Sequence, residues 1–134
     1  MPVDLDPHTL AIDATQLPGL IGPRTRAILV AHLFSSRMPL DPVITVARQH
    51  GLLVIEDCAE AYDASPYRGH PAADVSLFSF GPIKLATALG GALVRVREPG
   101  LLRRLRQQQA QYPRQARAAF LRRVGRFLLL PQPP

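Results

Sequence analysis

Several residue types are scarce in this 134-residue chain, and each scarcity narrows what the protein can be. Cysteine occurs once, at Cys58, so no internal disulfide can form and a reducing cytoplasm is the expected setting. Tryptophan is absent, and no apolar run is long enough to span a bilayer. The acidic N-terminus lacks the apolar segment of a secretory signal peptide.

Lysine is the scarcest charged residue, since Lys84 stands alone beside fifteen arginines. Arginine cannot replace lysine where an amine must lose its proton and attack a carbonyl, because a guanidinium stays protonated. Lys84 is therefore a candidate nucleophile for a Schiff base. The alternative is chance, in which a general bias toward arginine left one lysine in the sequence. The motif around Lys84 has to distinguish these two explanations.

Acidic residues are scarce near the C-terminus. Residues 95–134 carry a charge of +9 from ten arginines and one acid, whereas residues 1–94 carry −3 from six basic and nine acidic residues. The basic character belongs to the tail, which argues against a nucleic-acid-binding domain over the whole chain. We divide the chain into an α/β portion, residues 1–97, and a basic helical segment, residues 98–134.

Apolar runs of strand length predict an α/β fold. Residues 27–33 form a continuous apolar run typical of a buried parallel strand, and residues 52–57 are predicted to form a second buried strand. The segment 41–50 between them predicts a helix, with Asp41 as its N-cap and Pro42 at its first position. Such a βαβ unit favours parallel pairing of its two strands.

The rest of the chain is less regular. Residues 1–26 contain turn signals and are expected to be irregular. Two further strands are predicted over residues 75–80 and 92–96, and a helix starts at Pro99 and is broken by Pro113.

A second basic helix is predicted from about Arg114 to Leu130, with apolar residues at helical spacing. It has three interpretations: a solvated face over an apolar stripe, a contact with an anionic membrane surface, or a nucleic-acid contact. The last fits least, because the tail lacks interleaved stacking aromatics, and we expect no nucleic-acid partner.

Polar residues end two of the predicted strands. Asp57 ends one strand, and Ser79 and Lys84 end or follow the next. Ligands of open parallel sheets collect beyond the carboxyl ends of strands, so neighbouring strands would place these groups around one crevice. This arrangement suits pyridoxal phosphate (PLP): an amine condenses with its aldehyde, a carboxylate keeps its ring nitrogen protonated, and a hydroxyl binds its phosphate.

Three ordered motifs resemble the DegT/StrS-type sugar aminotransferases. They are Ile-Glu-Asp-Cys-Ala-Glu-Ala at 55–61, Asp-Val-Ser-Leu-Phe-Ser-Phe-Gly-Pro-Ile-Lys at 74–84 and Gly-Gly-Ala-Leu-Val at 90–94. The resemblance covers about residues 3–112. It implies a partial three-layer α/β/α sandwich, the large domain of aspartate aminotransferase-like (type I) PLP enzymes, followed by the basic helical tail.

The resemblance also implies roles for single residues. Lys84 would form the Schiff base with PLP and shuttle a proton, Asp57 would pair with the pyridinium nitrogen, and Ser79 would contact the phosphate. Glu60 stands where the family has Gln or His beside the cofactor ring, so it is either a cofactor-binding residue or a solvated loop acid.

The implied reaction is amino-group transfer from glutamate to a keto-sugar nucleotide in polysaccharide or secondary-metabolite biosynthesis. The family's phosphate-binding segment and small C-terminal domain have no counterpart in this sequence. We therefore expect an internal piece of the enzyme that needs a homodimer partner or a complementing chain. The competing hypothesis is a non-catalytic remnant, an α/β interaction module with a basic tail.

Other candidate residues have simpler explanations. The four histidines show no metal-ligand spacing, so no metal site is expected. His32 is interpreted as a structural histidine, with a place in the site as the alternative, and Cys58 as a small buried residue rather than a nucleophile. For Asp57, the alternative to cofactor binding is a helix N-cap.

Overall fold

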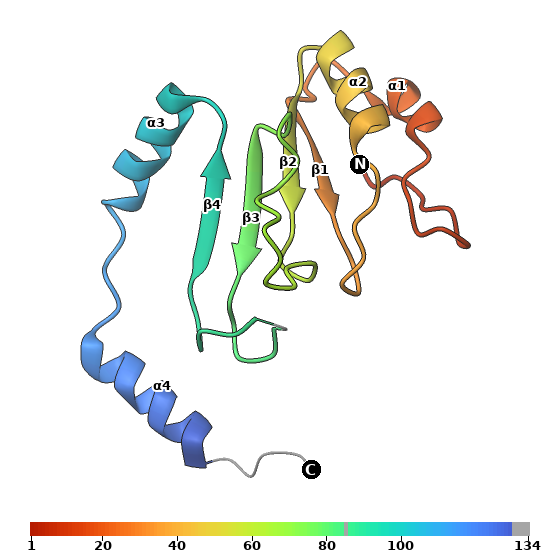
Figure 1. Cartoon of the computed structure of the whole chain (residues 1–134). Coiled ribbons are helices and arrows are strands. Elements are labelled where there is room, and N and C mark those ends of the chain that lie inside the picture. The colour runs from red at the N-terminus through yellow and green to blue at the C-terminus, as the bar shows by residue number, and fades with distance from the viewer. Residues whose placement is uncertain (85, 130–134) are drawn as a thin grey trace. The chain divides into compact units, whose positions relative to one another are not determined.

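The computed structural model describes residues 1–84 and 86–129 and divides into two compact units (Figure 1). Met1–Glu98 holds a sheet with flanking helices, and the described residues of the unit Pro99–Pro134 form two helices. Each unit is considered separately below.

One sheet of four strands organises the first unit. Its order is β1-β2-β3-β4; β1, β2 and β3 are parallel, and β4 is antiparallel to β3. The predicted strands and the parallel βαβ unit are confirmed, while the direction of β4 had not been predicted. The strands are β1 (Ala27–Ala31), β2 (Leu53–Asp57), β3 (Val75–Ser79) and β4 (Ala92–Val96).

Helix α2, Asp41–Gln49, connects β1 to β2 as predicted, but its cap differs from the expectation. The N-cap is Leu40, which provides no side-chain capping bond, and Asp41 is already the first helical residue. The Asp41 carboxylate lies 3.3 Å from Nε2 of His70 and is largely exposed.

The N-terminal segment is more ordered than expected. It forms a 3-10 turn, η1 (Ala14–Gln16), and a short helix, α1 (Leu17–Leu20). The Asp13 carboxylate accepts a hydrogen bond from the Thr15 N–H at 3.0 Å and so begins η1. Leu17 is buried in the core, which explains why tertiary packing stabilises a helix too short to persist alone.

The two faces of the sheet differ because successive residues of a strand point to opposite sides. The register aligns Val30 with Glu56 and Glu56 with Ser76, so these side chains share one face. Helix α2 packs on this side, since its Val43 and Ala47 belong to the same buried cluster as Val30. We call this side the covered face.

The opposite side, which we call the open face, carries Leu29, Leu53, Asp57 and Leu77 on its strands. Leu29 is 62% exposed and Leu53 is 43% exposed. Among the described residues of the first unit, no helix packs against this face. Because parallel sheets normally bury both faces, the described residues of the first unit hold the sheet and one of the two helical layers expected around it.

The second unit contains the two predicted basic helices, α3 (Pro99–Gln109) and α4 (Arg117–Leu129), and Pro113 lies between them. The predicted end of the second helix, Leu130, lies outside the described residues. No helix in the described part of the chain is long and apolar enough to cross a membrane.

Candidate functional site

Asp57 and Ser79 lie on the open face at the carboxyl ends of adjacent parallel strands. Asp57 is aligned with Leu77 across β2 and β3, and Ser79 follows Leu77 by two residues on the same side. Strand spacing and rise per residue put the Cα atoms of Asp57 and Ser79 about 8 Å apart. The expectation that β2 and β3 are neighbours is therefore confirmed, and the two polar side chains share one surface.

The Asp57 carboxylate caps a turn. Its Oδ1 accepts a hydrogen bond of 2.8 Å from the Ala59 N–H, and residues 59–61 form a turn rather than a helix. The alternative role as a helix N-cap is therefore wrong. One carboxylate oxygen is held by the backbone, and this fixes the direction in which the other can act.

Lys84 lies in the loop that follows β3. Its amine is 3.9 Å from a carboxylate oxygen of Glu60, and its side chain is partly buried. Among the described residues, no hydrogen bond or ion pair joins Lys84 to Asp57 or Ser79. The structure thus brings the predicted residues together as two pairs: Asp57 with Ser79 on the open face, and Lys84 with Glu60 between two loops.

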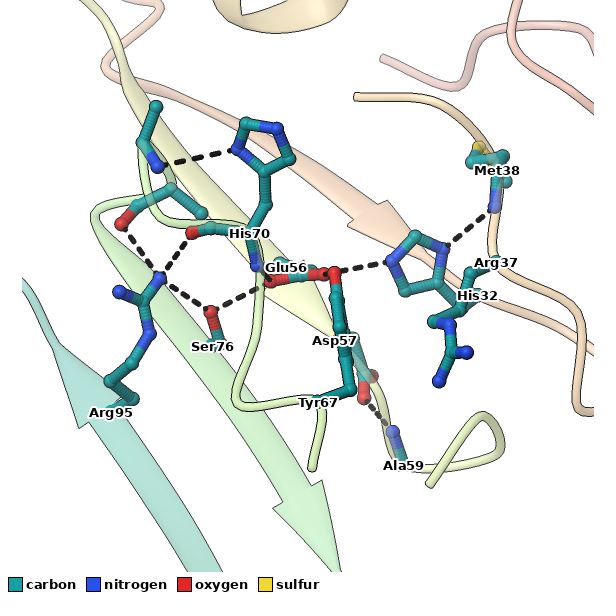
Figure 2. A network of polar contacts seen from close by, with 12 residues as sticks. His32, Arg37, Met38, Glu56, Asp57, Ala59, Tyr67, His70, Ser76 and Arg95 are labelled. Atoms are coloured by element: carbon teal, nitrogen blue, oxygen red, sulfur yellow. Dashed lines mark hydrogen bonds and ion pairs between the residues drawn. The ribbon is translucent and has the colours of Figure 1, made fainter. Parts of the chain in front are cut away.

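The sequence reasoning missed a buried acid that accepts several hydrogen bonds, Glu56, which is fully buried beside Asp57 in β2. Figure 2 shows Glu56 at the centre of a polar network on the covered face. It accepts hydrogen bonds from Ser76 Oγ at 2.7 Å, the His70 N–H at 2.8 Å, His32 Nε2 at 3.0 Å and the Tyr67 hydroxyl.

The four hydrogen-bond donors stabilise the negative charge of the Glu56 carboxylate. Burial raises the pKa of the Glu56 carboxyl, but hydrogen bonds from His32, Tyr67, Ser76 and the His70 N–H outweigh burial and lower the pKa to about 2. Glu56 is therefore a buried carboxylate at neutral pH. A charged residue inside an apolar strand was the available signal, because a buried charge must be paired. Its partners, however, could not be read from the local sequence.

His32 is a structural histidine, as interpreted from the sequence. The ring is 1% exposed, and both of its nitrogens are engaged. Nδ1 accepts from the Met38 N–H at 3.3 Å, which assigns the ring proton to Nε2, the nitrogen facing Glu56 (Figure 2). His32 thus ties the end of β1 to β2.

Arg95 and Gly69 surround Ser76 and so stabilise the hydrogen-bond network of Glu56. Arg95 of β4 donates to Ser76 Oγ at 3.1 Å and to the backbone carbonyls of His70 and Ala73 (Figure 2). Gly69 has φ +90°, and a Cβ there would lie 2.1 Å from Ser76 Oγ. Glycine is therefore required at position 69 both for its backbone conformation and for space.

Donor atoms of His32, Glu56 and Cys58 lie within 4.8 Å of one another, the spacing of a possible metal site. The donor set does not fit a metal. Both ring nitrogens of His32 and both oxygens of Glu56 are already hydrogen bonded. Burial and the nearby Glu56 raise the pKa of the Cys58 thiol to about 12, so it stays protonated and acts as a small buried side chain.

Solved structures define the class of fold. DesV of S. venezuelae, solved with a ketimine intermediate, matches 95% of this chain and 39% of its own at 30% identity and a TM-score of 0.70. NtdA of Bacillus subtilis, solved with bound cofactor PMP, matches 75% of this chain and 23% of its own at 27% identity and a TM-score of 0.64. The predicted fold of the PLP-dependent aminotransferases is confirmed.

Sequence comparison identifies the family. The profile of the DegT/DnrJ/EryC1/StrS aminotransferase family matches residues 1–122. GDP-perosamine synthase of Caulobacter vibrioides is 41% identical over 112 residues, which are 81% of this chain and 30% of that protein. L-glutamine:2-deoxy-scyllo-inosose aminotransferase of Streptomyces fradiae is 39% identical over 110 residues, 80% of this chain and 26% of that protein.

The chain therefore belongs to the DegT/DnrJ/EryC1/StrS aminotransferase family. It spans less than a third of the length of these curated relatives.

Proposed function

We propose that this chain provides the central part of the active site of a PLP-dependent sugar aminotransferase. The observation that carries the proposal is the shared position of Asp57 and Ser79 on the open face, at the ends of two parallel strands, with Lys84 in the loop that follows. Ligands of open α/β sheets collect at this end of the strands.

The chemistry of these residues fits the cofactor. PLP, when bound, supplies an electron sink for the bonds at the substrate carbon that carries the amino group. Asp57, held by the Ala59 N–H, has a carboxylate oxygen available to keep the ring nitrogen protonated by Coulomb attraction. The Ser79 hydroxyl is a suitable phosphate ligand, and the Lys84 amine is the group for covalent attachment and proton transfer.

Glu60 differs from the Gln or His that the family has at this position. Its carboxylate lies near the Lys84 amine, although half of its side chain is exposed. We propose that Glu60 holds this amine in the loop until the cofactor binds. The same contact gives Glu60 a role that a solvated loop acid would lack.

For the substrates, we propose a keto-sugar nucleotide as amino acceptor and glutamate as donor, in polysaccharide or secondary-metabolite biosynthesis in the cytoplasm. The relative named GDP-perosamine synthase supports a nucleotide sugar. The relatives named L-glutamine:2-deoxy-scyllo-inosose aminotransferase make glutamine the second donor to assay.

The open face indicates that the active protein contains more than these residues. Leu29, Leu53 and Val94 expose apolar surface on a sheet that its fold class buries on both sides. We propose that a complementing chain covers this face and completes the cofactor site, with a second copy of this chain as the alternative. The isolated chain should then be only marginally stable.

The test is cofactor binding by the full chain. PLP is added to the chain alone, and to the chain co-expressed with the flanking segments of the Caulobacter vibrioides synthase. A visible absorption band is expected that borohydride fixes and that Lys84→Ala abolishes. Lys84→Arg is the matched control, because it keeps the charge but cannot attach the cofactor.

Absence of the band under both conditions would contradict the proposal and favour the non-catalytic remnant, an α/β interaction module with a basic tail. Cooperative unfolding of the purified monomer at high temperature would contradict the need for a complementing chain.

A further inference from the structure

Helix α4 carries an apolar side that the proposed cofactor site does not use. Phe120, Val124 and Phe127 follow one another at spacings of four and three residues, which places them on one side of a helix. Leu121 and Leu128 widen this apolar side. Phe120 is 41%, Leu121 66% and Leu128 73% exposed, so much of the apolar surface of this unit faces solvent.

The other side of α4 is basic. Arg122 and Arg126 are exposed and lie away from the phenylalanines at this helical spacing, and the exposed Arg123 lies at the border, three residues after Phe120 and four before Phe127. Arg117 is the first residue of α4 and lies on the same side as the apolar residues. Its long aliphatic stem can place its charged group beyond the end of this apolar side. From Pro99 to Leu129 the sequence contains no acidic residue.

An anionic lipid surface is the partner that uses both sides of this helix at once. A helix of α4's length rises about 20 Å, too short to cross the hydrocarbon core, so it would lie in the plane of the membrane. In that orientation the apolar side enters the acyl boundary and the arginines remain at the level of the lipid phosphates.

Other partners use only one of these sides. Single-stranded nucleic acid is bound where aromatic and basic residues are interleaved, whereas in α4 Arg122 and Arg126 lie away from the phenylalanines and only Arg123 borders them. An apolar protein groove would bury Phe120 and Phe127 and leave the arginines without acidic partners. We therefore propose that α4 binds the surface of anionic membranes and attaches the protein to them peripherally.

The experiment is sedimentation of the full chain with sucrose-loaded vesicles, which needs no intrinsic fluorophore. We expect binding to vesicles of mixed phosphatidylcholine and phosphatidylglycerol and little binding to phosphatidylcholine alone. The triple variant Arg122→Gln, Arg123→Gln, Arg126→Gln should weaken binding by roughly two orders of magnitude, given the usual contribution of a basic residue at an anionic surface.

Helix α3 offers a matched control. The variant Arg103→Gln, Arg104→Gln, Arg106→Gln removes the same charge from a helix without phenylalanines, and we expect a loss of about tenfold or less. The double variant Phe120→Ser, Phe127→Ser should also weaken binding at high salt, where the apolar contribution remains. Circular dichroism of each variant checks that the helices and the sheet are retained.

Three results would overturn the proposal. The first is an equal loss of vesicle binding in the two triple arginine variants, which would mean that the lipid attracts any basic helix of the chain. The second is tighter binding to DNA than to the vesicles, with a steep salt dependence. The third is no binding to anionic vesicles at all. None of these results depends on whether the chain binds PLP.

Discussion

Glu56 and Asp57 are adjacent acids in one strand, yet they belong to opposite faces of the sheet, and we propose a functional role only for Asp57. Glu56 points into the covered face, where four donors satisfy its charge. Asp57 points to the open face, where the Ala59 N–H holds one oxygen and the other is available for a ligand. A saturated buried charge stabilises a structure, whereas an acid with spare capacity is suited to function.

The largest effect should come from filling the space beside Ser76. Gly69→Ala forces a Cβ against Ser76 Oγ and Glu56 Oε2 and adds strain at φ +90°. We expect a loss of about 3–5 kcal/mol in the free energy of unfolding, measured by urea denaturation of the protein completed by its complementing chain. Gly91→Ala is the matched control, because Gly91 has φ +91° but open space, and about 1 kcal/mol is expected. Equal losses would mean that backbone strain alone matters.

The second test compares the two acids directly. Glu56→Gln replaces an acceptor-only group by an amide whose NH₂ must face donors, so we expect a loss of about 3 kcal/mol in the unfolding free energy of the completed protein. Asp57→Asn on the open face should cost less than about 1 kcal/mol. If the two substitutions destabilise the chain equally, the distinction between the faces is wrong.

Acid sensitivity should follow Glu56. Its pKa in the folded chain, about 2, lies below the ordinary value of 4.5, so its contribution is complete above pH 4.5 and is lost as pH falls from 4.5 toward 2. This lowering of the Glu56 pKa corresponds to about 3 kcal/mol of unfolding free energy. Asp74, whose pKa is also lowered, contributes in the same direction. Unfolding measured across this range should be less pH-dependent in Glu56→Gln, and an unchanged slope would contradict the assignment.

Asp57→Asn should change stability least of these variants, but it should weaken cofactor binding. Asp57→Asn is expected to weaken PLP binding by about tenfold or more, because a neutral amide cannot hold the ring nitrogen protonated. The readout is the PLP titration of the completed protein, with Asp63→Asn, an exposed acid of the following loop, as control. Equal PLP affinity of Asp57→Asn and wild type would show that Asp57 does not bind the cofactor.

Much of the fold could be predicted from local patterns. Apolar runs of strand length and a helix between two of them were sufficient for the four strands, α2 and the parallel βαβ unit. The cap of α2 was predicted wrongly, and the short N-terminal helix could not be predicted because it depends on the burial of Leu17 in the core. The direction of β4 also depended on how the chain returns along β3.

By itself, the sequence determined the family, the strands of the sheet, the positions of Asp57 and Ser79 at the ends of strands, and the position of Lys84 after β3. It also determined the basic, acid-free character of the last helices. Only the tertiary structure decided which of two neighbouring acids is buried. Alternation places Glu56 and Asp57 on opposite faces, but which face closes depends on α2 and on donors more than ten residues away, such as Tyr67 and Ser76.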